Sequence, residues 1–148
     1  PAPAPVVAVA APTPTPVTVE LKDLMGPTGD GAANFGYDEG NSRIFMYSNG
    51  AVGLPLKIAA DGDYELTISA ACDEADGTKA KFSVSLDEQV VAAEVTCTDT
   101  APKDYVVKVP GAKAGAHKVS IAFLNDSYKE GAYDLNFFVH GVTLKPAK

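Results

Sequence analysis

Two carboxylates flank one short polar segment of the chain. The apolar run 121–124 ends at Asn125 and Asp126, and a second run begins at Asp134. Neighbouring carboxylates repel each other unless a cation joins them or one of them is protonated. Oxygen ligands with no nearby Cys or His suit a hard cation such as Ca²⁺. The spacing therefore predicts a calcium site at the loop 127–133, with coordination positions left open for a ligand.

The same segment brings amide, hydroxyl and aromatic groups together, which favours recognition of a polar ligand. Its residues also allow a plainer interpretation, in which Asn125 and Asp126 start a turn and Asp134 caps its end. Residue chemistry alone slightly favours this plainer interpretation.

A second acidic stretch lies earlier in the chain, at 25–41, and is rich in Gly and Asn. It contains Asp30, Asn34, Asp38 and Glu39, which are residue types that bind calcium. Their spacing is not that of an EF-hand loop. The stretch is therefore predicted to be a long, solvated surface loop.

Catalytic chemistry has little support in the residues. The two histidines, His117 and His140, stand in neither a nucleophile-elbow nor a metal-binding context. A Ser-His-Asp arrangement is spatial, so chain order does not exclude one, but no local pattern indicates it. Asp126 and Asp134 could serve glycoside hydrolysis, yet a small sandwich with one short acidic loop predicts no deep cleft. We expect a protein that is not an enzyme.

The elements that hold these residues are predicted to be strands. Apolar residues alternate with polar ones in Tyr64–Ser69 and again in Phe82–Leu86, and no segment of helical length has apolar residues at three- and four-residue spacing. Asn49-Gly50 predicts a hairpin turn. The pattern indicates an all-β fold, an antiparallel β-sandwich of jelly-roll type. Further strands are expected at Val17–Leu21, Arg43–Ser48, Ala51–Ile58, Gln89–Cys97, Asp104–Val109, His117–Leu124 and Asp134–Leu144.

Length and charge bound the possible functions. A chain of 148 residues predicts one domain, and the net charge of −7 argues against nucleic acid or an anionic membrane as partner. No apolar run approaches the ~20 residues that cross a bilayer. Residues Pro1–Pro16 hold six of the eleven prolines, so we expect a semi-rigid Pro/Ala-rich linker at 1–16 and a folded module at 17–148.

The two cysteines, Cys72 and Cys97, both stand at the ends of predicted strands. In a secreted protein they would form a disulfide, and in a cytosolic one they would be buried free thiols. The sequence leaves both alternatives open.

Several segments together resemble a known family. They are VTVELKDL, IFMYSNGAVGLPLKI, GDYELTISA and above all GAHKVSIAFLNDSY…YDLNFFVHGVTL. These segments resemble the calcium-dependent xylan-binding carbohydrate-binding modules of families thirty-six and sixty. The resemblance extends from Val17 to Leu144.

The resemblance implies a β-sandwich whose loops hold one Ca²⁺ ion with incomplete protein coordination, so that sugar hydroxyls complete the shell. By matching position, Asp126 and Asp134 would supply carboxylates, and Tyr47 and Tyr133 would supply backbone carbonyls. The residues implied to contact the sugar are Asn125, Tyr128 and Asn136. The family's second, structural calcium site is predicted to be absent, because Lys22 and His140 stand where acidic ligands are usual.

The function expected on this basis is a non-catalytic carbohydrate-binding module, secreted or on a cell surface. It would bind xylan, or galactan or β-glucan, through an open Ca²⁺ site. It would also hold a larger multidomain parent, such as a glycoside hydrolase, against plant-type polysaccharide. The alternative is a structural or adhesion β-sandwich domain of a secreted or cell-surface protein.

Overall fold

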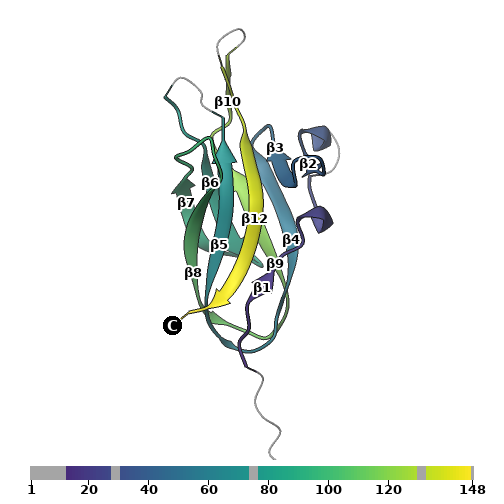
Figure 1. The fold of residues 1–148 in the computed structure, drawn as a ribbon, viewed down its shortest axis with the longest axis vertical. Helices are drawn as coiled ribbons and strands as arrows, with labels where there is room; N and C mark the ends of the chain where they lie inside the picture. The colour runs from purple at the N-terminus through teal and green to yellow at the C-terminus, as the bar shows by residue number, and fades with distance from the viewer. Residues whose placement is uncertain (1–12, 28–30, 74–76, 130–132, 148) are drawn as a thin grey trace, which may run out of the picture.

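Two antiparallel sheets pack face to face in the computed structural model, which describes residues 13–27, 31–73, 77–129 and 133–147, with the backbone alone at 128, 129 and 133 (Figure 1). The expected all-β antiparallel sandwich is confirmed. The six-stranded sheet has the order β2-β3-β12-β5-β8, with β1 also paired to β12. Its strands are β1 (Val17–Thr18), β2 (Phe35–Asp38), β3 (Arg43–Met46), β5 (Gly62–Cys72), β8 (Lys103–Ala112) and β12 (Phe137–Pro146).

The second sheet has four strands in the order β4-β9-β6-β7. Two short 3₁₀ turns and a separate two-stranded ribbon complete the described elements. The bounds are β4 (Gly50–Ile58), β6 (Lys81–Leu86), β7 (Gln89–Thr96), β9 (Gly115–Phe123), β10 (Ser127–Lys129), β11 (Tyr133–Leu135), η1 (Leu21–Asp23) and η2 (Ala32–Asn34).

The core follows from the two-residue periodicity of the strands. Along β5 the side chains of Tyr64, Leu66 and Ile68 are buried, whereas Glu65 and Thr67 between them are partly exposed. Successive strand residues face opposite sides of a sheet, so one face of β5 contributes to the core and the other meets solvent. The facing strands alternate in the same way, and their buried side chains form one continuous apolar core between the sheets.

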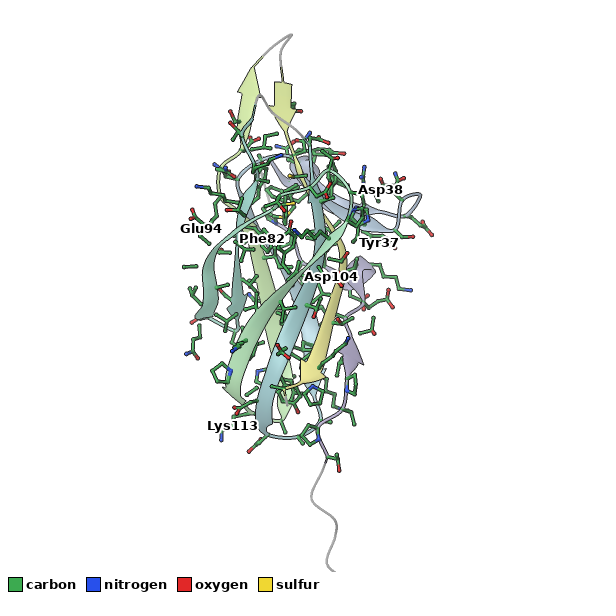
Figure 2. The ribbon with its side chains drawn as sticks, turned by 60° about the vertical axis from the view of Figure 1, so that its left-hand side comes forward. Tyr37, Asp38, Phe82, Glu94, Asp104 and Lys113 are labelled. Carbon is green, nitrogen blue, oxygen red and sulfur yellow. The ribbon has the colours of Figure 1, made fainter. Side chains whose placement is uncertain are left out.

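Three aromatic rings connect the two sheets inside this core. Phe137 of β12 stacks on Phe82 of β6 with 4.8 Å between ring centroids, and it lies 5.9 Å from the ring of Phe123 on β9. All three side chains are almost fully buried, and Figure 2 places Phe82 in the interior of the sandwich. Phe137 therefore ties the start of β12 to the opposite sheet.

The predicted hairpin at Asn49-Gly50 is wrong. β3 belongs to the six-stranded sheet and β4 to the four-stranded one, so the dipeptide turns a corner between sheets. Gly50 has a φ of 150°, and a Cβ there would lie 2.7 Å from the Phe35 ring. A corner and a hairpin need the same conformational freedom, which is why the dipeptide alone does not distinguish them.

The long loop expected at 25–41 contains regular structure. η2 lies within it, and β2 pairs with β3 as the edge of the six-stranded sheet. Asp38 accepts hydrogen bonds from Asn41 and lies 3.7 Å from Arg43. Asp30 lies outside the described residues. The first strand is also shorter than expected, because η1 begins at Leu21.

The loop expected at 127–133 forms a two-stranded ribbon. β10 pairs with β11, with Tyr128 opposite Asp134. In Figure 1 this ribbon projects from one end of the sandwich, and β1 and the C-terminus lie towards the other end. Asp134 is thus fixed by strand pairing, which a loop would not provide.

Cys72 and Cys97 are buried free thiols that lie next to each other. The Sγ atom of Cys72 is 3.5 Å from the carbonyl oxygen of Cys97. A hydrogen bond between the two thiols lowers the pKa of Cys72. A disulfide between them stays a prediction for oxidising conditions.

In the described part of the chain, no helix has the length and apolar character needed to cross a bilayer.

Candidate metal centre

One end of the sandwich carries an open polar pocket of about 670 Å³. Its described lining comes from η2, β3 and the connection to β4, the residue after β5, the residue before β10, and the segment from β11 into β12. The lining residues among those described are Asn34, Arg43, Tyr47, Ser48, Asp73, Asp126, Asp134, Asn136 and Phe138.

Asp126 is held in the pocket through its backbone. Its N–H donates a 2.6 Å hydrogen bond to Oδ1 of Asn49, at the corner between β3 and β4. Its side-chain Oδ1 is buried and has no hydrogen-bond partner among the described residues. Burial, and then the charge of Asp134, raise the pKa of the Asp126 carboxyl. A backbone hydrogen bond from Ser127 to the same carboxyl lowers the pKa in part. A buried carboxylate oxygen without a donor, such as Oδ1, is an unsatisfied acceptor.

Asn136 joins the other two carboxylates of the pocket. Its Nδ2 donates to Oδ2 of Asp73 at 2.9 Å and to Oδ2 of Asp134 at 3.2 Å. Its Oδ1 is buried and, like that of Asp126, has no partner in the described part. Asn136 thus donates to both carboxylates, while its own acceptor oxygen stays unpaired.

Unpaired buried oxygens are what a hard cation satisfies, and leaving one unpaired costs about 1–3 kcal/mol. The oxygen-rich set of Asp126, Asp134 and Asn136 fits Ca²⁺ in chemistry. Within the described ranges, no group of three or more Asp, Glu, His or Cys side chains is arranged to hold a metal ion. Since Ca²⁺ takes six to eight oxygens, amide, backbone and external oxygens would have to complete its shell.

Four of the residues expected at the site are brought together. Asp126, Asp134, Tyr47 and Asn136 all line the pocket. The side chain of Tyr128, for which the resemblance implies a sugar contact, lies outside the described part. Tyr133, implied to offer its backbone carbonyl to the ion, pairs with Lys129 in the ribbon, and its role as a ligand stays a prediction.

Asn125 is held elsewhere. Its Oδ1 accepts a 2.7 Å hydrogen bond from the N–H of Lys81, and its Nδ2 donates to the carbonyl of Lys79 at 2.8 Å. The structure therefore gives Asn125 a structural role at the start of β6, in place of the expected sugar contact.

Sequence reasoning missed Asp73 and Arg43, and it assigned Asn34 to a solvated loop. Asp73 reaches the pocket because of the register between β5 and β12. Cys72 pairs with Phe137, so the residues just beyond them, Asp73 and Asn136, become neighbours. An Asp directly after a predicted strand was the available signal, but the partner strand could not be read from the sequence.

The two histidines are partly buried and lie on different strands, His117 on β9 and His140 on β12. Nδ1 of His117 lies 2.7 Å from Asp87, and its Nε2 faces the carbonyl oxygen of Lys113, so both ring nitrogens are engaged. His140 lies at a bulge of β12, where burial and then the charge of Arg43 lower its pKa. The absence of a second calcium site near Lys22 and His140 stays a prediction.

Comparison with known proteins adds a family match. Residues 65–148, more than half of the chain, match the model of CBM60, described as a Ca-dependent carbohydrate-binding module that binds xylan. A search of curated proteins finds no match.

Solved structures with a similar fold include several carbohydrate-binding modules. The CBM36-1 domain of a multidomain xylanase from the hindgut metagenome of Trinervitermes trinervoides has a TM-score of 0.67 at 11% identity, covering 90% of this chain and 98% of that chain. CBM36 in complex with calcium and xylotriose has 0.50 at 17%, covering 90% and 99%. The GH26-CBM35 β-(1,4)-mannanase of Podospora anserina has 0.57 at 19%, covering 90% and 28%. At these identities the likeness concerns the fold.

Proposed function

The chain belongs to CBM60, a family of Ca-dependent xylan-binding carbohydrate-binding modules, and from this premise we propose that its pocket binds a polysaccharide through one Ca²⁺ ion. The protein is a non-catalytic carbohydrate-binding module. The residues of its pocket would hold both the ion and the sugar.

The observation that carries the proposal is the unpaired, buried Oδ1 of Asp126 beside Asp134. Asp126 and Asp134 would hold the ion, with the amide oxygen of Asn136 and backbone carbonyls of Tyr47 and Tyr133 as further ligands. When bound, Ca²⁺ supplies positive charge and exchangeable positions that a pair of sugar hydroxyls can fill in place of water. Its flexible geometry allows this exchange with little strain.

Tyr47 offers the sugar an apolar contact beside the ion. Its side chain is 43% exposed, and its ring stacks on Phe45 at 4.6 Å and meets the edge of Phe138 at 6.3 Å. A ring braced on two sides presents its face to a ligand at a small cost in side-chain entropy. The chain has no Trp, so a wide aromatic platform for crystalline polysaccharide is not expected.

The wider setting belongs to the same proposal. Residues 1–16 would act as a linker to a larger multidomain parent such as a glycoside hydrolase, and the protein would be secreted or on a cell surface. Within the described ranges the folded part begins with β1 at Val17, which supports the proposed boundary between linker and module.

The deciding experiment titrates xylohexaose into the protein in millimolar calcium chloride and again after chelation with EDTA. We expect a Kd of roughly 10 μM to 1 mM, or about −4 to −7 kcal/mol, in calcium and no binding after chelation. Binding that survives chelation would overturn the proposal. Calcium that raises the melting temperature without any binding of xylan, galactan or β-glucan would instead favour a structural or adhesion domain.

Asn49 offers a test of the site that leaves its carboxylates in place. Asn49→Ala removes the acceptor that holds the backbone of Asp126, so we expect calcium affinity to fall about 10- to 100-fold, as for other groups that orient metal ligands. Calorimetric titration with calcium chloride measures this. Asp63→Ala removes an acceptor that holds the backbone N–H of Gly111 at 2.8 Å, at the start of β5 away from the pocket, and serves as the matched control. Equal calcium affinity in the two variants would refute the assigned role.

A further inference from the structure

We infer that Arg43 forms a subsite for a sugar carboxylate beside the cation position, so that chains bearing uronic acid branches bind more tightly than neutral ones. The inference rests on the proposed function and names the class of polysaccharide that the pocket prefers.

Arg43 is held at the wall of the pocket by an aromatic ring. It is the first residue of β3, in which Ile44 and Met46 are fully buried, so Arg43 faces the outer side of the sheet. Its guanidinium carbon lies 3.8 Å from the centroid of the Phe138 ring, and Phe138 is only 6% exposed. A guanidinium stacked in this way keeps its orientation, and its edge stays open to a partner.

One donor of this guanidinium is unused, because Nε of Arg43 is buried and has no hydrogen-bond partner in the described part of the chain. Its ion-pair contact is Oδ2 of Asp38, at 3.7 Å, and this oxygen already accepts a 2.7 Å hydrogen bond from Asn41. The guanidinium fork carries five donors that match a carboxylate. With 28% of its side chain exposed, Arg43 can still bind a carboxylate that enters the pocket.

The charges of the pocket favour an anion that arrives together with the metal. Asp73, Asp126 and Asp134 against Arg43 give the lining a formal charge of −2, which repels an anionic sugar. One Ca²⁺ ion would bring that charge to zero. The lining then no longer repels an anion, and the guanidinium, whose ion-pair contact with Asp38 is as long as 3.7 Å, can bind a ligand carboxylate.

A plainer role for Arg43 is to balance the pocket carboxylates without touching the ligand. The two roles predict different effects of the ligand's charge on its binding affinity. A balancing charge treats acidic and neutral ligands alike, whereas a carboxylate subsite discriminates between them and loses this discrimination when the fork is removed.

The test compares two ligands that differ in one group: a xylo-oligosaccharide with a single glucuronic acid branch, and the same compound with its carboxyl reduced to an alcohol. Calorimetry in calcium should give about tenfold tighter binding of the acid, as a charge-assisted pair warrants. We expect Arg43→Gln to abolish this preference and Lys57→Gln, an exposed cation on β4, to keep it. Without sugar, Arg43→Gln should bind Ca²⁺ more tightly than the parent, because a repelling charge is gone.

Equal affinity for the two ligands, or a preference that survives in Arg43→Gln, would overturn the inference. Weaker calcium binding by Arg43→Gln would contradict its electrostatic basis. If the reduced ligand binds in a calcium-dependent manner but the acid binds no better, the inference alone fails. If neither ligand binds in calcium, the proposed function fails with it.

Discussion

Asp126→Asn should abolish calcium binding, and sugar binding with it, while the metal-free protein stays at least as stable as the parent. The substitution removes a charged ligand, so we expect calcium affinity to fall by more than about 100-fold, beyond what the loss of a residue that only orients a ligand costs. It also removes a carboxylate that is costly in the metal-free protein, since burial, and then the charge of Asp134, raise the pKa of Asp126. A purely structural Asp would behave in the opposite way, because its loss would destabilise the fold with or without metal.

Calorimetric titration with calcium and thermal unfolding with and without calcium measure the two effects. At a hundredfold excess of calcium over its Kd, binding stabilises the parent by about 2.7 kcal/mol, and Asp126→Asn should lose this increment. Asp134→Asn should behave alike. Asp104→Asn, which changes an exposed carboxylate on β8, is the control and should retain calcium binding. A metal-free Asp126→Asn protein clearly less stable than the parent would contradict the metal-site assignment.

The all-β fold could be predicted from the sequence because the patterns that indicate strands lie within single segments. The alternation along β5 and β6 and the turn-forming residues between strands can each be recognised without knowing which strands pair. The corner at Gly50 was misassigned because a glycine with positive φ permits both a hairpin and a change of sheet. The choice between them depends on the partner strands β9 and β12, which the sequence does not identify.

The site was predictable only in part, for the same reason. Asp126 and Asp134 are eight positions apart and flank one turn, so proximity along the chain brings them together. Asp73 and Arg43 come from distant segments that join the pocket through the pairing of β5 and β3 with β12. Asn34 enters through η2, where its carbonyl accepts a hydrogen bond from the N–H of Tyr47. Contacts of this kind require the strand register, which no single segment specifies.

Phe137→Ala should cause the largest loss of stability of any substitution proposed. Phe137 is fully buried between Phe82 and Phe123 of the opposite sheet, and truncating a buried Phe costs about 3–5 kcal/mol through lost transfer energy and the cavity left behind. A domain of this size has a total stability of about 5–15 kcal/mol. Phe137→Leu, which keeps more of the volume, should lose less and remain folded.

Substitution of Phe137 should also affect the metal site, because Phe137 is adjacent in sequence to a residue of the pocket. Asn136 directly precedes Phe137 and links Asp73 to Asp134, so a loosened Phe137 should weaken calcium binding even in folded Phe137→Leu. Chemical denaturation gives the stability, and calcium titration of the leucine variant gives the affinity. Val106→Ala, at a side chain 58% exposed, should change neither quantity. If Phe137→Leu lost stability but bound calcium like the parent, the core would be supporting the fold without positioning the carboxylates. The site would then be held by the corner at Asn49 and the ribbon β10–β11 alone.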